Sequence, residues 1–155
     1  MTEMTIITKQ WFEQRDLLSY KTRVERKKLP ELIAYVQKNI DSIGLCAVDD
    51  IIFSVEEEVS EPDVSIVNVE LLIPVNKNFR SSSRYVFKPV FRLENAVLAK
   101  YCGQFDKLDD AHRKLSEYLI CNRMQPITKV YYVLRSLRED NGVIDMFVGV
   151  NGNVS

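Results

Sequence analysis

The sequence has few of the residues on which enzyme and metal sites depend. Its 155 residues include one histidine, five glycines and three cysteines. The cysteines show no C-x-x-C spacing, and one histidine cannot complete a zinc site with thiols so far apart in the chain. The chain also has no glycine-rich phosphate loop and no G-x-S-x-G motif. The standard enzyme motifs are therefore missing, and we expect no metal and no cofactor.

The sequence also lacks an excess of charge of one sign, and it has no long apolar run. The chain has 21 basic and 22 acidic residues, a formal net charge of -1, which gives no electrostatic reason to expect nucleic acid or an anionic membrane as the main partner. No window approaches a membrane-spanning length, and Met1–Gln10 lacks the pattern of a secretory signal. We expect a cytoplasmic protein without a membrane span or direct contact with nucleic acid.

What the chain does contain is enough apolar material for a hydrophobic core. It is 46% hydrophobic and 28% charged, as is typical of one soluble globular domain. A folded chain of this length buries roughly two-thirds of the surface that its unfolded form exposes. We expect a single domain over residues 1–155 that is stable without disulfides. The three cysteines lie beside apolar neighbours and are predicted to be buried free thiols.

The first half of the chain shows the order strand, helix, strand, strand. Leu17–Thr22 alternates apolar and polar residues as a strand does, and Leu29–Ile40 repeats apolar residues every three or four positions as an amphipathic helix does. Gly44 marks the end of that helix. Two further strands are predicted at Asp50–Glu56 and Val64–Val75. Trp11 and Phe12 mark a possible opening strand.

The second half repeats this order. Its predicted elements are a strand at Ala96–Cys102, a turn at Gly103, a helix at Leu108–Leu119 and strands at Val130–Leu134 and Val143–Val150. The last two strands are predicted to form a hairpin whose signal is Asn141-Gly142. Arg80–Leu93 is predicted to be linker running into a strand.

The two halves align at a nearly constant offset. Leu29 and Leu108 are 79 positions apart, as are Ile51 and Val130, and the offset falls to 75 between Val75 and Val150. A second hairpin four residues shorter than the first would produce this change. We interpret the pattern as an internal duplication. The pseudo-repeats cover about 5–76 and 84–151, with a linker at about 77–83.

The second half also resembles a known family. Tyr101-Cys102-Gly103-Gln104-Phe105, followed by a helix and a closing strand that contains an acid, is similar to the gyrase-inhibitor-like (GyrI-like) effector-binding domains over residues 84–151. Members show a strand ending in His-x-Gly-x-Tyr, an amphipathic helix, a tyrosine-bearing strand, and a last strand with a glutamate followed by an aromatic residue and a proline. Here Tyr101 stands for the histidine, Asp145 for the glutamate and Gly149 for the proline.

This resemblance implies a fold and a type of function. The fold would be α+β, with two duplicated strand-helix-strand-strand units that form antiparallel sheets with helices on one face and a central groove. The groove would bind a small effector molecule. Loss of the family's histidine and proline indicates a groove that is no longer kept for the family's own ligands.

The alternation of strand residues gives a candidate site. In the last strand, Asp145 and Phe147 share the face that is not expected to meet the helix, and the duplication puts Glu70 at the position of Asp145. An aromatic wall with a carboxylate suits a cationic or amphiphilic organic ligand. The candidate ligand-binding residues are Asp145, Phe147, Tyr131, Tyr132, Tyr101 and Glu70. In the simpler interpretation, the acids are solvated and the tyrosines are packing residues.

Three functions stay open on the sequence. The main expectation is a non-catalytic small-molecule-binding protein, a stand-alone domain of the effector-binding kind, whose ligand lies in a groove between the two repeats. The alternative is a protein-interaction module of the inhibitor, chaperone or immunity type, favoured by the loss of the family's histidine and proline. A hydrolase using Asp145 and Tyr131 comes third, because no histidine, thiolate pair or metal would activate water.

Overall fold

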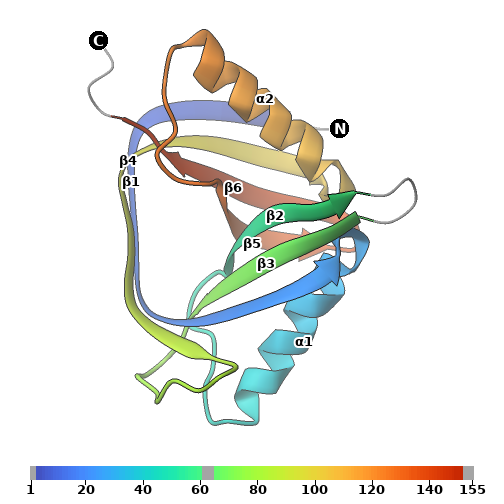
Figure 1. The fold of residues 1–155 in the computed structure, drawn as a ribbon, viewed down its shortest axis with the longest axis vertical. Helices are drawn as coiled ribbons and strands as arrows, with labels where there is room; N and C mark the ends of the chain where they lie inside the picture. Colours follow the sequence, from blue (N-terminus) through green and yellow to red (C-terminus); the bar gives the residue numbers. More distant parts are fainter. Residues whose placement is uncertain (1–2, 61–64, 152–155) are drawn as a thin grey trace. The chain divides into compact units, whose positions relative to one another are not determined.

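A computed structural model of the chain describes residues 3–60 and 65–151. Within these ranges six strands and two α-helices form an α+β fold (Figure 1). The elements are β1 (Glu3–Glu25), η1 (Arg26–Lys28), α1 (Leu29–Asp41), β2 (Ile52–Ser60), β3 (Ser65–Pro74), β4 (Val86–Gln104), η2 (Phe105–Lys107), α2 (Leu108–Cys121), β5 (Tyr131–Arg138) and β6 (Asn141–Gly149), where η denotes a 3-10 helix. Across the described ranges, neither helix is long and apolar enough to cross a membrane.

The chain divides into two compact units. Unit 1 comprises Met1–Glu13 and Arg92–Ser155, and unit 2 comprises Gln14–Phe91. In unit 2, β3 pairs antiparallel with β1 on one side and β2 on the other. In unit 1, β6 pairs antiparallel with β4 and β5 in the same way. Each unit therefore contains a three-stranded antiparallel sheet and one helix, which confirms the predicted α+β architecture.

The elements of the two units recur at the spacing expected from the sequence. α1 begins at Leu29 and α2 at Leu108, 79 positions later, and each helix follows a three-residue 3-10 helix. The ladders agree as well, because Leu17 lies opposite Pro74 in unit 2 and Ala96, again 79 positions on, lies opposite Gly149 in unit 1. Duplication of the sequence stays our interpretation of this pattern.

Each helix buries one apolar stripe, as the periodicity predicts. Burying an aliphatic side chain stabilises a fold by roughly 1.5–3 kcal/mol. These stripes therefore supply much of the free energy that holds each helix in its unit. The buried residues are Leu29, Ile33, Val36 and Ile40 in α1 and Leu108, Ala111, Leu115 and Leu119 in α2.

Two turn predictions based on glycine are wrong in detail. Gly103 does not turn the chain, since it lies inside β4 opposite Gly142. It also lacks the positive φ of a glycine turn, which among the described glycines only Gly44 has. The β5–β6 hairpin forms, but its turn is Glu139-Asp140, with Glu139 at a φ of 54°. Asn141 and Gly142 begin β6 instead. Gly142 occupies a tight position there, because an added Cβ would come within 3.2 Å of the Ile144 side chain.

The prediction of buried cysteines is also wrong. Cys46, Cys102 and Cys121 are all free and exposed. In a strand, apolar neighbours in sequence do not show that a residue is buried, because adjacent side chains point to opposite faces. Cys102 shows this directly, since its neighbour Tyr101 is only 1% exposed.

Both helices end in the same capping motif. In each, the N–H that follows a left-handed residue donates to a carbonyl five positions earlier, at 3.1 Å after α1 and 2.9 Å after α2. This is the Schellman arrangement, which favours glycine at the left-handed position. After α1 that residue is Gly44, with a φ of 82°, and after α2 it is Arg123, with a φ of 55°. The predicted end of the first helix at Gly44 is confirmed.

We expect opposite effects of substitution at these two positions. Arg123→Gly should raise the free energy of unfolding by about 0.5–1 kcal/mol, because it removes the steric cost of a left-handed side chain. Gly44→Ala should lower it by about 1 kcal/mol, through the backbone alone, since the nearest atom to an added Cβ is the Lys77 Nζ at 3.9 Å. Urea unfolding of both variants measures this. A destabilised Arg123→Gly protein would contradict the account.

Candidate functional site

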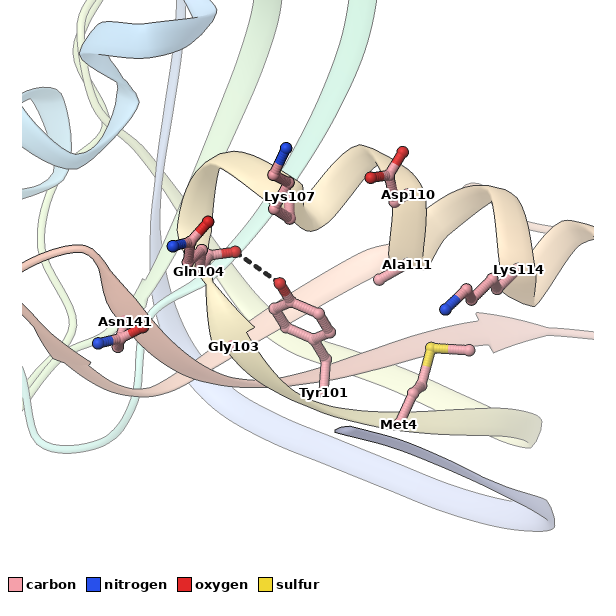
Figure 2. Close-up of a pocket in the computed structure, with 9 residues that line it drawn as sticks. All are labelled: Met4, Tyr101, Gly103, Gln104, Lys107, Asp110, Ala111, Lys114 and Asn141. Carbon is pink, nitrogen blue, oxygen red and sulfur yellow. Dashed lines mark hydrogen bonds between the residues drawn. The ribbon is translucent and has the colours of Figure 1, made fainter. Parts of the chain in front are cut away.

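In unit 1 an acid lies on the face of the sheet that is turned away from the helix. Tyr101 lines a cavity beneath α2 (Figure 2) and lies opposite Ile144 in the ladder. Directly opposite residues point to the same side of a sheet, so Ile144 is on the helix face. Asp145 and Phe147 therefore lie on the other face, which we call the Asp145 face. The sidedness predicted for the last strand agrees with this placement.

Asp145 is held by an arginine. The Nε of Arg135 donates to the Oδ2 of Asp145 at 2.8 Å, and the exposed fractions of the two side chains are 36% and 13%. Leu134 pairs with Ile144, and Ser136 pairs with the next residue of β6, Val143, so Arg135 is the extra residue of a β-bulge. Bulges bend a strand locally and can redirect a side chain toward a site.

An aromatic wall stands beside this ion pair. The rings of Phe12 and Phe147 lie 4.7 Å apart between centroids and are tilted by 36°. Tyr131 lies directly opposite Phe147 in β5, and Leu98 lies opposite it in β4. Phe147 is buried, whereas Phe12 and Tyr131 are partly exposed. The Asp145 face therefore combines one carboxylate, one arginine and a partly open aromatic surface.

In unit 2 the corresponding acid is Glu70, and it is more enclosed. Lys21 lies opposite Glu70 in the ladder, as Lys100 lies opposite Asp145 in unit 1. Glu70 is buried, and its Oε2 accepts hydrogen bonds from the Ser19 hydroxyl at 2.5 Å and the Lys88 ammonium at 2.8 Å. It is not a solvated surface acid.

These neighbours keep the Glu70 carboxylate charged. Burial alone raises the pKa of Glu70, because the charged form loses water. The hydrogen bonds from Lys88 and Ser19, together with the positive charges of Lys88 and Lys21, outweigh burial and place the pKa below its usual value. Glu70 thus acts as a buried anion that fixes the side chains around it.

The structure brings together only some of the predicted site residues. Asp145, Phe147 and Tyr131 share one face of unit 1. Tyr132 lies opposite Met146, which places it on the helix face. Tyr101 lies on the helix face too, buried, with its hydroxyl donating to the Gln104 carbonyl at 2.6 Å. Tyr132 and Tyr101 therefore do not lie on the Asp145 face. Each lies opposite a residue next to Asp145 in β6, and adjacent residues of a strand point to opposite faces.

Sequence reasoning missed the partners of the two acids. Ser19 lies in a predicted strand, where alternation with its apolar neighbours could have placed it on the face of Glu70. No sequence signal marked Arg135, because its position depends on a bulge. For Phe12 the sequence predicts only a place in an opening strand. Among the residues that the structure describes, no cluster of three or more histidine, cysteine, aspartate or glutamate side chains could hold a metal ion.

Comparison with solved structures identifies the fold. The chain superimposes on EcmrR in a structure of the EcmrR-DNA complex with a TM-score of 0.74 and 14% identity, covering 97% of this chain and 57% of EcmrR. It matches the crystal structure of the EcmrR C-terminal domain with a TM-score of 0.67 and 14% identity, covering 97% and 98% of the two chains. An uncharacterised conserved protein from Listeria innocua matches with a TM-score of 0.56 and 11% identity, over 97% of this chain and 92% of that one.

These likenesses show that the chain has the fold of the EcmrR C-terminal domain. No family model matches the sequence, and no curated protein matches it. The chain spans little more than half of the EcmrR chain in the DNA complex. The expected α+β fold class is therefore confirmed, and membership of one particular family is not assigned.

Replacing Lys88 tests the role of Glu70 in stability. Lys88→Met should lower the free energy of unfolding at pH 7 by about 1 kcal/mol, a modest value because the lysine is 41% exposed and water screens the pair.

The effect should depend on pH. The lowered pKa of Glu70 gives stability that is complete above its ordinary value of 4.5 and is lost as the pH falls through the folded-state pKa. The difference between Lys88→Met and wild type should therefore shrink below pH 4.5, and Glu70→Gln should abolish this dependence. Urea unfolding at pH 7 and pH 3.5 measures both effects, and an equal difference at the two values would contradict the assignment.

Proposed function

We propose that this protein binds a small organic molecule on the Asp145 face of unit 1 and does not transform it. The observation that carries the proposal is the Arg135–Asp145 ion pair, at 2.8 Å, beside the Phe12–Phe147 ring pair. The fold supports the proposal, because the EcmrR C-terminal domain and this chain share the architecture of regulator effector-binding domains. Fold alone does not fix function, so the chemistry of the face has to identify the ligand.

The face favours a ligand that is both aromatic or amphiphilic and cationic. Phe12, Phe147 and Tyr131 offer apolar area and ring faces that attract a positive charge. Asp145 supplies a countercharge two residues along the strand from Phe147. A cationic group is therefore recognised by the carboxylate while the rest of the ligand packs on the rings.

Arg135 competes with such a ligand. It occupies the Oδ2 of Asp145 in the unliganded protein, and its side chain is 36% exposed. Because the arginine is exposed enough for water to screen the pair, a ligand cation can take its place on the carboxylate. Because Asp145 is engaged by arginine, it serves as a countercharge for binding rather than as a catalytic base. The hydrolase alternative thus has no observation in its favour.

Removing the carboxylate should abolish recognition of the cation. With (2-naphthylmethyl)trimethylammonium as the probe, Asp145→Asn should weaken binding at least tenfold, because a charge-assisted contact is lost. Binding of the neutral analogue 2-naphthalenemethanol should change little. Isothermal titration calorimetry measures both, and Glu117→Gln, an exposed acid on α2, is the matched control. Equal losses in the two variants would remove Asp145 from the site.

Removing the competing arginine should have the opposite effect. Arg135→Gln should tighten binding of the same ammonium probe about threefold to tenfold, since the Asp145 carboxylate no longer has to be vacated. Weaker binding in Arg135→Gln would show that the arginine holds the site together instead of competing for it. If no probe binds the wild type, the protein-interaction alternative takes precedence.

Cys102 offers an independent reporter of occupancy. It lies opposite Val143 in the ladder, on the Asp145 face, and it is exposed. In a Cys46→Ser, Cys121→Ser background, a saturating ammonium probe should slow alkylation of Cys102. An unchanged rate, with binding confirmed by calorimetry, would place the ligand elsewhere.

A further inference from the structure

Unit 1 contains a cavity on the helix face that the proposed function does not use. Its volume is about 380 Å³, within the range of small-molecule sites. Figure 2 shows α2 above the cavity, with Tyr101 and Met4 on the sheet side. Gly103, Gln104 and Asn141 close one end. Since Tyr101 and Asp145 lie on opposite faces of the sheet, this cavity and the Asp145 face are separate places in unit 1.

The charges around the cavity are mainly positive. Lys107, the last residue of η2, and Lys114 on α2 both line it. Neither has an ion-pair partner within the part of the chain that the structure describes. The one carboxylate on the wall, Asp110, is already bound by Arg113 at 2.9 Å. In Figure 2 the Lys114 side chain points from α2 toward Met4, whereas Asp110 and Lys107 both point to the other side of the helix. The cavity therefore presents the Lys114 ammonium beside the partly exposed Met4 side chain, with the buried Tyr101 ring beneath.

Unit 2 uses the corresponding part of its helix differently. Tyr35 on α1 stands 79 positions before Lys114, the offset that relates the two helices. Tyr35 is the main cause of a raised pKa of Arg84, whose guanidinium lies over the rings of Tyr20 and Tyr85 at 5.6 and 5.3 Å from their centroids. In unit 2 the protein's own cation is thus satisfied by its own tyrosines, whereas in unit 1 Lys114 lacks such a partner beside Tyr101.

We propose that the cavity beneath α2 is a binding site for a small aromatic carboxylate. The Lys114 ammonium pairs with the carboxylate, and the aromatic body packs on Met4 above the buried Tyr101 ring. The Tyr101 hydroxyl is already donating to the Gln104 carbonyl, so this bond fixes the ring in place and Lys114 recognises the charge of the ligand. This site takes ligands of the opposite charge to those of the Asp145 face.

The test uses 2-naphthoate and its neutral analogue 2-naphthamide. We expect 2-naphthoate to bind the wild type more tightly than 2-naphthamide by calorimetry. Lys114→Met should weaken naphthoate binding about fivefold to tenfold and leave naphthamide binding unchanged, because only the charge-assisted contact is removed. Lys38→Met, an exposed lysine in the last turn of α1, is the matched control and should have no effect. Because Lys114 is exposed, its replacement should not unfold the protein.

Three results would overturn the proposal. They are equal affinity for naphthoate and naphthamide, equal effects of Lys114→Met and Lys38→Met, and no naphthoate binding at millimolar concentration. The Asp145→Asn variant separates this site from the proposed function, since it should bind naphthoate as the wild type does. Naphthoate binding that tightens in Asp145→Asn, where Arg135 is released for the ligand, and is unchanged in Lys114→Met would place the anion on the Asp145 face and also overturn the proposal.

Discussion

A carboxylate in the middle of a largely buried strand needs a cation or hydrogen-bond donors beside it, and both sheets of this protein are arranged around that requirement. In unit 2 the donors are Ser19 and Lys88, which share one oxygen of Glu70. In unit 1 the partner is Arg135, which reaches Asp145 from a bulge in β5. In each ladder a lysine of the neighbouring strand also lies opposite the acid.

The two acids nevertheless have different consequences. Glu70 is enclosed and bound by two donors, so its charge serves the stability of unit 2. Asp145 has a single arginine partner that is partly open to solvent, and the Phe12–Phe147 pair stands next to it. A pair whose arginine is partly exposed beside an aromatic surface is suited to exchange its cation for one carried by a ligand. The same position in the two sheets is thus structural in one and, in our proposal, a recognition site in the other.

The sequence was informative where periodicity decides the structure. Both helices, the order of the strands and the placement of Asp145 and Phe147 away from the helix followed from apolar spacing. It was misleading where a turn was predicted from residue type alone. Gly103 and Asn141-Gly142 are typical turn residues, but they lie in strands. Arg135 could not be predicted, because a bulge depends on how two strands pair. The family resemblance suggested Tyr101 for the site, but strand alternation places it on the helix face.

The most direct test of the central claim is to observe the Arg135 side chain while a cation binds. The Nε–H resonance of Arg135 can be followed by nitrogen-15 NMR during titration with (2-naphthylmethyl)trimethylammonium and assigned with Arg135→Gln. The account predicts that this resonance moves to the position of a solvent-exposed arginine as the ligand saturates. An Nε–H resonance that stays at its unliganded position while the ligand is bound would show that the Arg135–Asp145 pair remains closed, and would contradict the account.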